Sequence, residues 1–257
     1  MILPLKMMWD RVELARGDSD TTLFLHLLYA GEMLMKLVTA SLVAAVTDDR
    51  EGHRYRLTHR LIRSDGLGDW AQTLDEVLVG PPAQHLLETA TEDQRSLAER
   101  FRSGTWQYEA VDRLFRVVGS VAGHLDPLPV RVPLRQWFAG FVTLRNSTRG
   151  HGATTPETCG KLALDLEQSI ELIRDNLPVL QRPWAYLHRN LSGKFRIVPL
   201  GEDTSSFDQL KTITGASTTR HRNLSDGVYA DFCEYYESRS RIYEHRCDGF
   251  FLPKWRF

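Results

Sequence analysis

Apolar residues run almost without interruption from residue 23 to residue 46, and they do not alternate with polar ones as they would in a half-buried strand. The polar string DSDTT just before this run offers several side chains that cap helices. The run is apolar nearly all round, apart from a few positions such as His26, Glu32 and Lys36. The pattern therefore predicts a central helix buried on most of its surface.

The same reading predicts helices over most of the first 180 residues, at about 70–79, 83–101, 105–123 and 132–148. The string GPP breaks the chain between the first two of these. A last helix is expected to begin after Thr155, which is a suitable N-cap, with Pro156 and Glu157 in its first turn. It should end at about Asn176, just before Pro178.

After Arg182 the pattern of apolar and polar residues changes. Two stretches are typical of short strands around Gly and Asp-Gly turns, namely WAYLHRNLSGKFRIVPLGED and SRIYEHRCDGFFLP. The sequence thus predicts a mainly α fold. A helical domain covers residues 1–180, and a small α+β or β-rich C-terminal region covers 181–257. That region is either an appendage or part of a truncated domain.

Composition limits the class of protein. Hydrophobic residues make up 42% and charged residues 25% of the 257, and the net charge is −1, so any contact with nucleic acid must be local. The three cysteines form no CxxC pair, which suits a reducing cytoplasm and indicates neither a zinc site nor a disulfide framework. No signal peptide is recognisable. Charges at the centre of a bilayer each cost about 2.5–3.5 kcal/mol, so we expect a cytoplasmic protein without a membrane span.

Polar chemistry gathers in TLRNSTRGHGATTPE, residues 143–157. Arg145 lies eleven residues after Leu134, about three helical turns, so it shares the apolar stripe of Leu134, Phe138 and Phe141. A cation on such a stripe must be paired, reach an interface or line a cleft. Glycines on both sides of His151 break the helix, so His151 can turn back toward Arg145.

Two interpretations of this stretch stay open on spacing alone. In the first, the exposed amides of the next helix bind an anion, and the Arg145 guanidinium binds a phosphate through two parallel hydrogen bonds. Asn146 then fixes the tautomer of His151, which exchanges protons near neutral pH. In the second, Arg145 caps its helix, Asn146 and Gly150 form the C-terminal turn, and His151 is solvated. Polar groups of this kind are common at helix ends, so spacing does not decide for catalysis.

Arg145, its neighbour Asn146 and His151 together resemble the signature of the HEPN superfamily. Five residues, NSTRG, lie between Arg145 and His151. The motif also stands late in a helical bundle, just before its final helix, as in that family. The string RNSTRGHG is similar to HEPN proteins of bacterial defence and toxin systems. The resemblance covers roughly residues 20–180, and the motif is its specific part.

This resemblance implies a metal-independent, cofactor-free endoribonuclease that cleaves single-stranded RNA to 2′,3′-cyclic phosphate and 5′-hydroxyl ends. It implies a homodimer with one composite active site and a possible antitoxin or activator protein as partner. His151 would be the general acid/base, Arg145 would stabilise the phosphorane and Asn146 would orient His151 or the phosphate, with Arg149 as a second phosphate contact. Two alternatives stand beside it: a non-catalytic HEPN module for assembly or nucleotide sensing, and a plain helical scaffold.

Two further groups have open interpretations. HRYRLTHRLIR, residues 53–63, is either a track for the RNA backbone or a solvated face balanced by acids such as Asp48, Asp49 and Glu51. Its arginines are Arg54, Arg56, Arg60 and Arg63.

Glu32 and Lys36 stand one turn apart on the central helix. They either interact with Arg145 and hold it in position, or form an ion pair with each other. The second interpretation is favoured, because a local pair needs no help from another helix. Trp137, beside the stripe of Arg145, is expected to lie in the core or in a dimer interface rather than to stack on a base.

Overall fold

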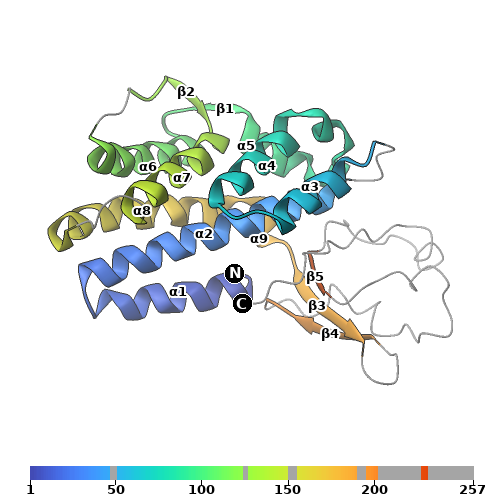
Figure 1. Cartoon of the computed structure of the whole chain (residues 1–257), viewed down its shortest axis with the longest axis horizontal. Coiled ribbons are helices and arrows are strands. Elements are labelled where there is room, and N and C mark those ends of the chain that lie inside the picture. Colours follow the sequence, from blue (N-terminus) through green and yellow to red (C-terminus); the bar gives the residue numbers. More distant parts are fainter. Residues whose placement is uncertain (47–50, 124–126, 150–154, 190–194, 202–226, 231–257) are drawn as a thin grey trace.

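The computed structural model describes residues 1–46, 51–123, 127–149, 155–189, 195–201 and 227–230. The fold is mainly α, as predicted (Figure 1). His151, its two flanking glycines, Asp48, Asp49, Cys233, Cys247 and the predicted strands at 240–253 lie outside the described residues.

The helical part is organised around α2 (Asp20–Ala45). Figure 1 shows α1 (Leu3–Arg16) and α8 (Pro156–Asn176) lying along it, and α4 (Leu67–Val79) also packs against it. The Ser19 hydroxyl caps α2 by accepting a hydrogen bond from the Thr22 amide at 3.1 Å. Most of α2 is buried, so the predicted central helix is confirmed.

The remaining elements complete the bundle. They are α3 (His53–Ile62), the 3-10 turns η1 (Pro81–His85) and η2 (Glu88–Ala90), α5 (Thr91–Ala98), β1 (Arg100–Arg102), α6 (Trp106–Ala122), β2 (Arg131–Pro133), α7 (Arg135–Arg149) and α9 (Pro178–Gln181).

Several predicted boundaries agree with the structure. The helices α6 and α8 match the predictions at 105–123 and after Thr155, and the Thr155 hydroxyl accepts from the Thr158 amide at 3.2 Å. The helix expected from about residue 70 begins slightly earlier, at Leu67. Short helices are best predicted where a cap and an apolar period coincide.

The single helix predicted at 83–101 is wrong. Leu86 and Leu87 are extended and divide this segment into η1, then η2 and α5. The Leu87 amide donates to the carbonyl of Ala45 at 2.9 Å, and Val46 forms a bridge with Leu86. The segment therefore satisfies backbone groups at the C-terminal end of α2, which local propensity does not reveal.

Three helices are tied together by one buried hydrogen-bond chain. The Trp137 indole N–H on α7 donates to Ser169 Oγ on α8 at 2.7 Å, and Ser169 in turn donates to the Ala110 carbonyl on α6 at 2.7 Å. Trp137 is fully buried, so it belongs to the core. Its ring stacks on Phe141 with centroids 4.9 Å apart, which fixes the position of that phenyl ring as well.

After α9, β3 (Trp184–Arg189) and β4 (Phe195–Pro199) form the antiparallel pair that the sequence indicated here. A third strand, β5 (Gly227–Ala230), pairs with β3 on its other edge. The sheet is joined to the helices because Trp184 is buried and its N–H donates to the Val179 carbonyl at 3.1 Å. Figure 1 shows it beside the start of α1, where the Leu3 amide donates to the Leu200 carbonyl.

Within the described part of the chain, α2 is the one helix long and apolar enough to cross a bilayer. However, 72% of its most apolar window is already buried inside the protein. A core helix of a water-soluble bundle satisfies the same criterion, so α2 is weak support for a membrane span.

Candidate functional site

Arg145 stands at the edge of the buried stripe of α7. Phe138 and Phe141 are buried along this stripe, whereas the Arg145 side chain is 34% exposed. Its Nε donates to Oε1 of Glu32 on α2 at 3.1 Å, and the Glu32 side chain is only 14% exposed. A cation at this place is thus compensated by a carboxylate 113 residues away in the chain.

Glu32 is paired differently from the favoured expectation. Its carboxylate binds Arg145 of α7, not its own helix neighbour Lys36 one turn away. Lys36 is half-buried and has no ion pair among the residues that the structure describes. The reason is the close crossing of α7 over α2, which brings a guanidinium to Glu32 and makes the local pair unnecessary.

The bond to Glu32 uses only one edge of the guanidinium. Within the described ranges, neither Nη1 nor Nη2 of Arg145 forms a hydrogen bond or an ion pair. An arginine fork presents its donors in a plane, so one edge can be held while another binds an anion. Arg145 is therefore oriented by the protein and still has donors for a phosphate.

Asn146 and Arg149 both lie in the last turn of α7, which continues to Arg149. The Arg145 guanidinium binds Glu32 of α2 rather than a backbone carbonyl at the end of α7 within the described residues. Asn146 is exposed. The backbone of Arg149 lies one helical turn beyond Arg145, and thus on the same side of α7.

Arg145, the first residue of the motif, lies against the N-terminal half of α2, where it binds Glu32. Helix α7 ends at Arg149 and α8 begins at Pro156, so residues 150–155 join the two. The first turns of α8 touch the start of α2 closely, since a Cβ added to Gly160 would be 2.4 Å from Oδ2 of Asp20. Arg145 near the end of α7 thus contacts α2 at Glu32, and the first turns of α8 contact α2 at Asp20.

The arginines of α3 have mixed surroundings. Arg56 and Arg60 both bind the carboxylate of Glu76 on α4, the second at 2.7 Å. Burial alone would raise the pKa of Glu76, but hydrogen bonds from these two guanidinium groups outweigh it and hold that pKa below its usual range. Arg56 and Arg60 of the proposed RNA track therefore have an acidic partner on α4.

Arg54 is half-buried and Arg63 is exposed. Of the acids named as neighbours, Glu51 binds Nε2 of His53 at 3.0 Å. An RNA contact by this helix stays a prediction, and Arg63, which follows its last residue, is exposed.

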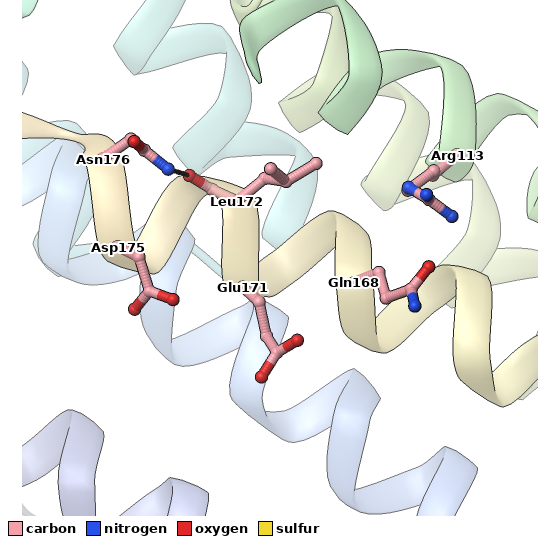
Figure 2. Close-up of a pocket in the computed structure, with 6 residues that line it drawn as sticks. All are labelled: Arg113, Gln168, Glu171, Leu172, Asp175 and Asn176. Atoms are coloured by element: carbon pink, nitrogen blue, oxygen red, sulfur yellow. Dashed lines mark hydrogen bonds between the residues drawn. The ribbon is translucent and has the colours of Figure 1, made fainter.

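A hollow between α6 and α8 has a different chemistry (Figure 2). Arg113 in it is paired with Asp165 at 2.8 Å, and burial raises the pKa of Glu171. Because its lining begins twelve residues into α8, it lies about 18 Å along that helix from the first residue, Pro156. The carboxylates of Glu171 and Asp175 at its rim would repel a phosphate. The hollow is lined by Arg113, Gln168, Glu171, Leu172, Asp175 and Asn176.

In the described ranges, no three His, Cys, Asp or Glu side chains are placed to hold a metal ion. The sequence reasoning did not single out Gly31 or Tyr29 of α2, both of which prove to be close to the Glu32–Arg145 pair. Gly31 is a small residue within a run of large apolar ones, which was a usable signal for a close helix crossing.

Comparison with protein-family models, with curated proteins and with solved structures finds no match to this chain. Its function must therefore be argued from the motif and from the geometry around Arg145.

Proposed function

We propose that this chain is a cytoplasmic, metal-independent endoribonuclease of the HEPN type that cleaves single-stranded RNA. The observation that carries the proposal is the state of Arg145. Its Nε is held by the buried carboxylate of Glu32, and its two Nη groups have no partner among the described residues. A preorganised donor edge of this kind stabilises charge that develops in a transition state.

In the proposed reaction the ribose 2′-hydroxyl attacks its own phosphorus. The 2′-oxygen–phosphorus bond forms, and the bond from phosphorus to the 5′-oxygen of the next nucleotide breaks. His151 removes the proton from the 2′-hydroxyl and a protonated histidine delivers one to the leaving 5′-oxygen. In a homodimer two motifs face one cleft, so one His151 can serve each step.

Arg145 neutralises the charge that grows on the phosphorane oxygens, with its Nη edge toward the phosphate. Asn146 orients His151 or the phosphate, and Arg149 adds a second phosphate contact from the same side of α7. Glu32 is a positioning residue in this scheme, because it acts through Arg145. A defence or toxin role would add an antitoxin or activator protein as partner.

The alternative is a non-catalytic HEPN module for assembly or nucleotide sensing. One observation favours it: Glu32 already compensates the charge of Arg145, as a purely structural ion pair would. Substitution of Glu32 distinguishes the enzyme from the non-catalytic module. A structural pair affects stability, whereas a positioning residue also affects the rate of a stably folded enzyme.

The test is cleavage of mixed single-stranded RNA in EDTA by wild type, Arg145→Ala and His151→Ala, with analysis of the new ends. We expect cyclic phosphate ends from wild type and a rate about 10²–10⁴-fold lower for His151→Ala. Arg11→Ala is the matched control, because it removes an exposed arginine of α1 and should cleave normally.

Equal cleavage by all four proteins would remove the catalytic claim. A wild type that binds RNA without cutting it would establish the non-catalytic module instead. Circular dichroism of each variant excludes loss of folding as the cause.

A further inference from the structure

One face of α2 is partly exposed to solvent. Between residues 23 and 39 every buried position lies outside this face, and at 3.6 residues per turn the exposed and half-buried positions fit within an arc of about 120°. Tyr29 lies in the middle of the arc and is 40% exposed. The exposed or half-buried residues of this face are Leu25, His26, Tyr29, Glu32, Met33 and Lys36.

The arc joins the candidate site directly. Tyr29 stands three residues before Glu32, so their Cβ atoms are about 5–6 Å apart. Glu32 in turn holds Arg145 at 3.1 Å. Tyr29 and the Arg145 guanidinium, whose Nη edge faces a phosphate in the proposed function, thus both lie beside Glu32.

The surroundings of Tyr29 suit a flat apolar ligand. Its ring makes an edge-to-face contact with His26, with centroids 6.0 Å apart and planes at 72°. Leu25 is 37% exposed on the preceding turn, and Met33 is half-buried on the next. Such a braced aromatic ring with apolar neighbours and cations nearby is how proteins bind unpaired bases without reading their identity.

We propose that Tyr29 is a stacking platform for an unpaired nucleobase next to the phosphate bound by Arg145. This inference rests on the proposed function, and it names the substrate class: single-stranded RNA, chosen by base accessibility rather than base identity. A base in a duplex is stacked between its neighbours and cannot lie on Tyr29. Lys36, without an ion pair in the described ranges, supplies a cation at the same arc.

A second copy of the chain is the other possible occupant of this face. The charges favour RNA, because Lys36 and the Nη edge of Arg145 both lie on the C-terminal side of Tyr29, where the phosphate next to a stacked base would bind. The experiment therefore measures both RNA affinity and oligomeric state.

The test uses the full chain with His151→Ala, which prevents cleavage, and a fluorescently labelled single-stranded RNA of twelve nucleotides. We expect Tyr29→Ala to weaken binding by about 5- to 150-fold, as loss of one base stack does, and Tyr29→Phe to bind normally. The slope of log affinity against log salt should not change in Tyr29→Ala, because no charge is lost. In Arg145→Ala it should become shallower by about 0.7.

Tyr186→Ala is the matched control, since Tyr186 on β3 is 37% exposed, lies outside α2 and the proposed RNA track, and should not affect affinity. Unchanged affinity of Tyr29→Ala, equal losses in Tyr29→Phe and Tyr29→Ala, or no RNA binding by the parent would each overturn the inference. A change of Tyr29→Ala from dimer to monomer in sedimentation would assign the face to a second copy.

The two proposals fail separately. If wild type does not cleave RNA but binding depends on Tyr29 as described, the catalytic proposal fails and the platform stands. If cleavage depends on His151 while Tyr29→Ala is normal in binding and rate, the platform fails and the ribonuclease stands.

Discussion

Gly31 is the residue that permits α7 to approach α2. A Cβ at this position would be 2.3 Å from two ring carbons of Phe141, well inside contact distance. The phenyl ring has little room to retreat, because it stacks on Trp137, whose indole N–H is bound to Ser169. Arg145 stands one turn after Phe141, so this contact sets how well it meets Glu32.

We predict that Gly31→Ala is destabilising despite its better helix propensity. Alanine gains up to about 1 kcal/mol over glycine in a helix, whereas overpacking a core costs about 1–3 kcal/mol. The variant should also lose RNA cleavage, because α7 moves away from α2. Urea unfolding and a cleavage assay below the unfolding transition measure the two effects.

Gly68→Ala on α4 is the control, because its nearest neighbour would be Val142 Cγ1 at an ordinary 3.9 Å. It should be neutral or slightly stabilising. Equal stability of the Gly31 and Gly68 variants would show that the α2–α7 crossing has room for an extra methyl group, contrary to the packing described above.

At the scale of elements, α3 is fastened to α4 by Glu76 with Arg56 and Arg60. The pKa of Glu76 is lowered in the folded protein, so the folded state binds its proton more weakly than the unfolded chain does. The pair therefore stabilises the fold fully above the unfolded pKa of about 4.3, and this contribution is lost as the pH falls through the folded pKa.

We accordingly predict that Glu76→Gln lowers the free energy of unfolding at pH 7, and that its difference from wild type shrinks as the pH falls below about 4.3. Urea unfolding of both proteins between pH 7 and pH 3 provides the measurement. Asp93→Asn is a useful comparison, because burial raises the pKa of Asp93 and the sign of its pH dependence is opposite. A difference for Glu76→Gln that stays constant to pH 3 would contradict the prediction.

Elements whose signals are local were predictable from sequence. The helices α2, α6 and α8 each have a hydroxyl cap and a long apolar pattern, so they were found with nearly correct limits. The segment around Leu86 and Leu87 was not, because its extended form depends on the end of α2. The strands β1 and β2, three residues each, are too short to show an alternating pattern.

The candidate site was likewise predictable from the sequence only in part. The need of Arg145 for a partner followed from its place on an apolar stripe. The choice of Glu32 as that partner, and the failure of Glu32 to pair with Lys36, depend on how α7 crosses α2 at Gly31. That crossing is a tertiary contact between positions 110 residues apart, so helical spacing alone gave the wrong preference for Glu32.

For the whole molecule, the composite cleft implied by the HEPN resemblance makes activity depend on association. Each chain carries one Arg145–His151 motif, and the proposed reaction uses a histidine on each side of the phosphate. Mass action then makes the active fraction depend on protein concentration.

We predict that the cleavage rate per chain falls on dilution, over the same range in which sedimentation shows dimers dissociating. Addition of catalytically inactive His151→Ala chains at the low concentration should not restore the full rate, because mixed dimers lack one of the two histidines. A rate per chain that stays constant in samples that sediment as monomers would exclude the composite site.

The single bond from Arg145 Nε to Glu32 also determines which amino acids position 145 tolerates. A lysine would keep the charge, but its ammonium is a compact point charge at the end of a flexible stem. Drawn to Glu32, the ammonium would be neutralised there; drawn to a phosphate, it would give up its bond to the Glu32 carboxylate. Only a flat, delocalised cation faces two anions from opposite edges, so at this position the shape of the charge matters as much as its sign.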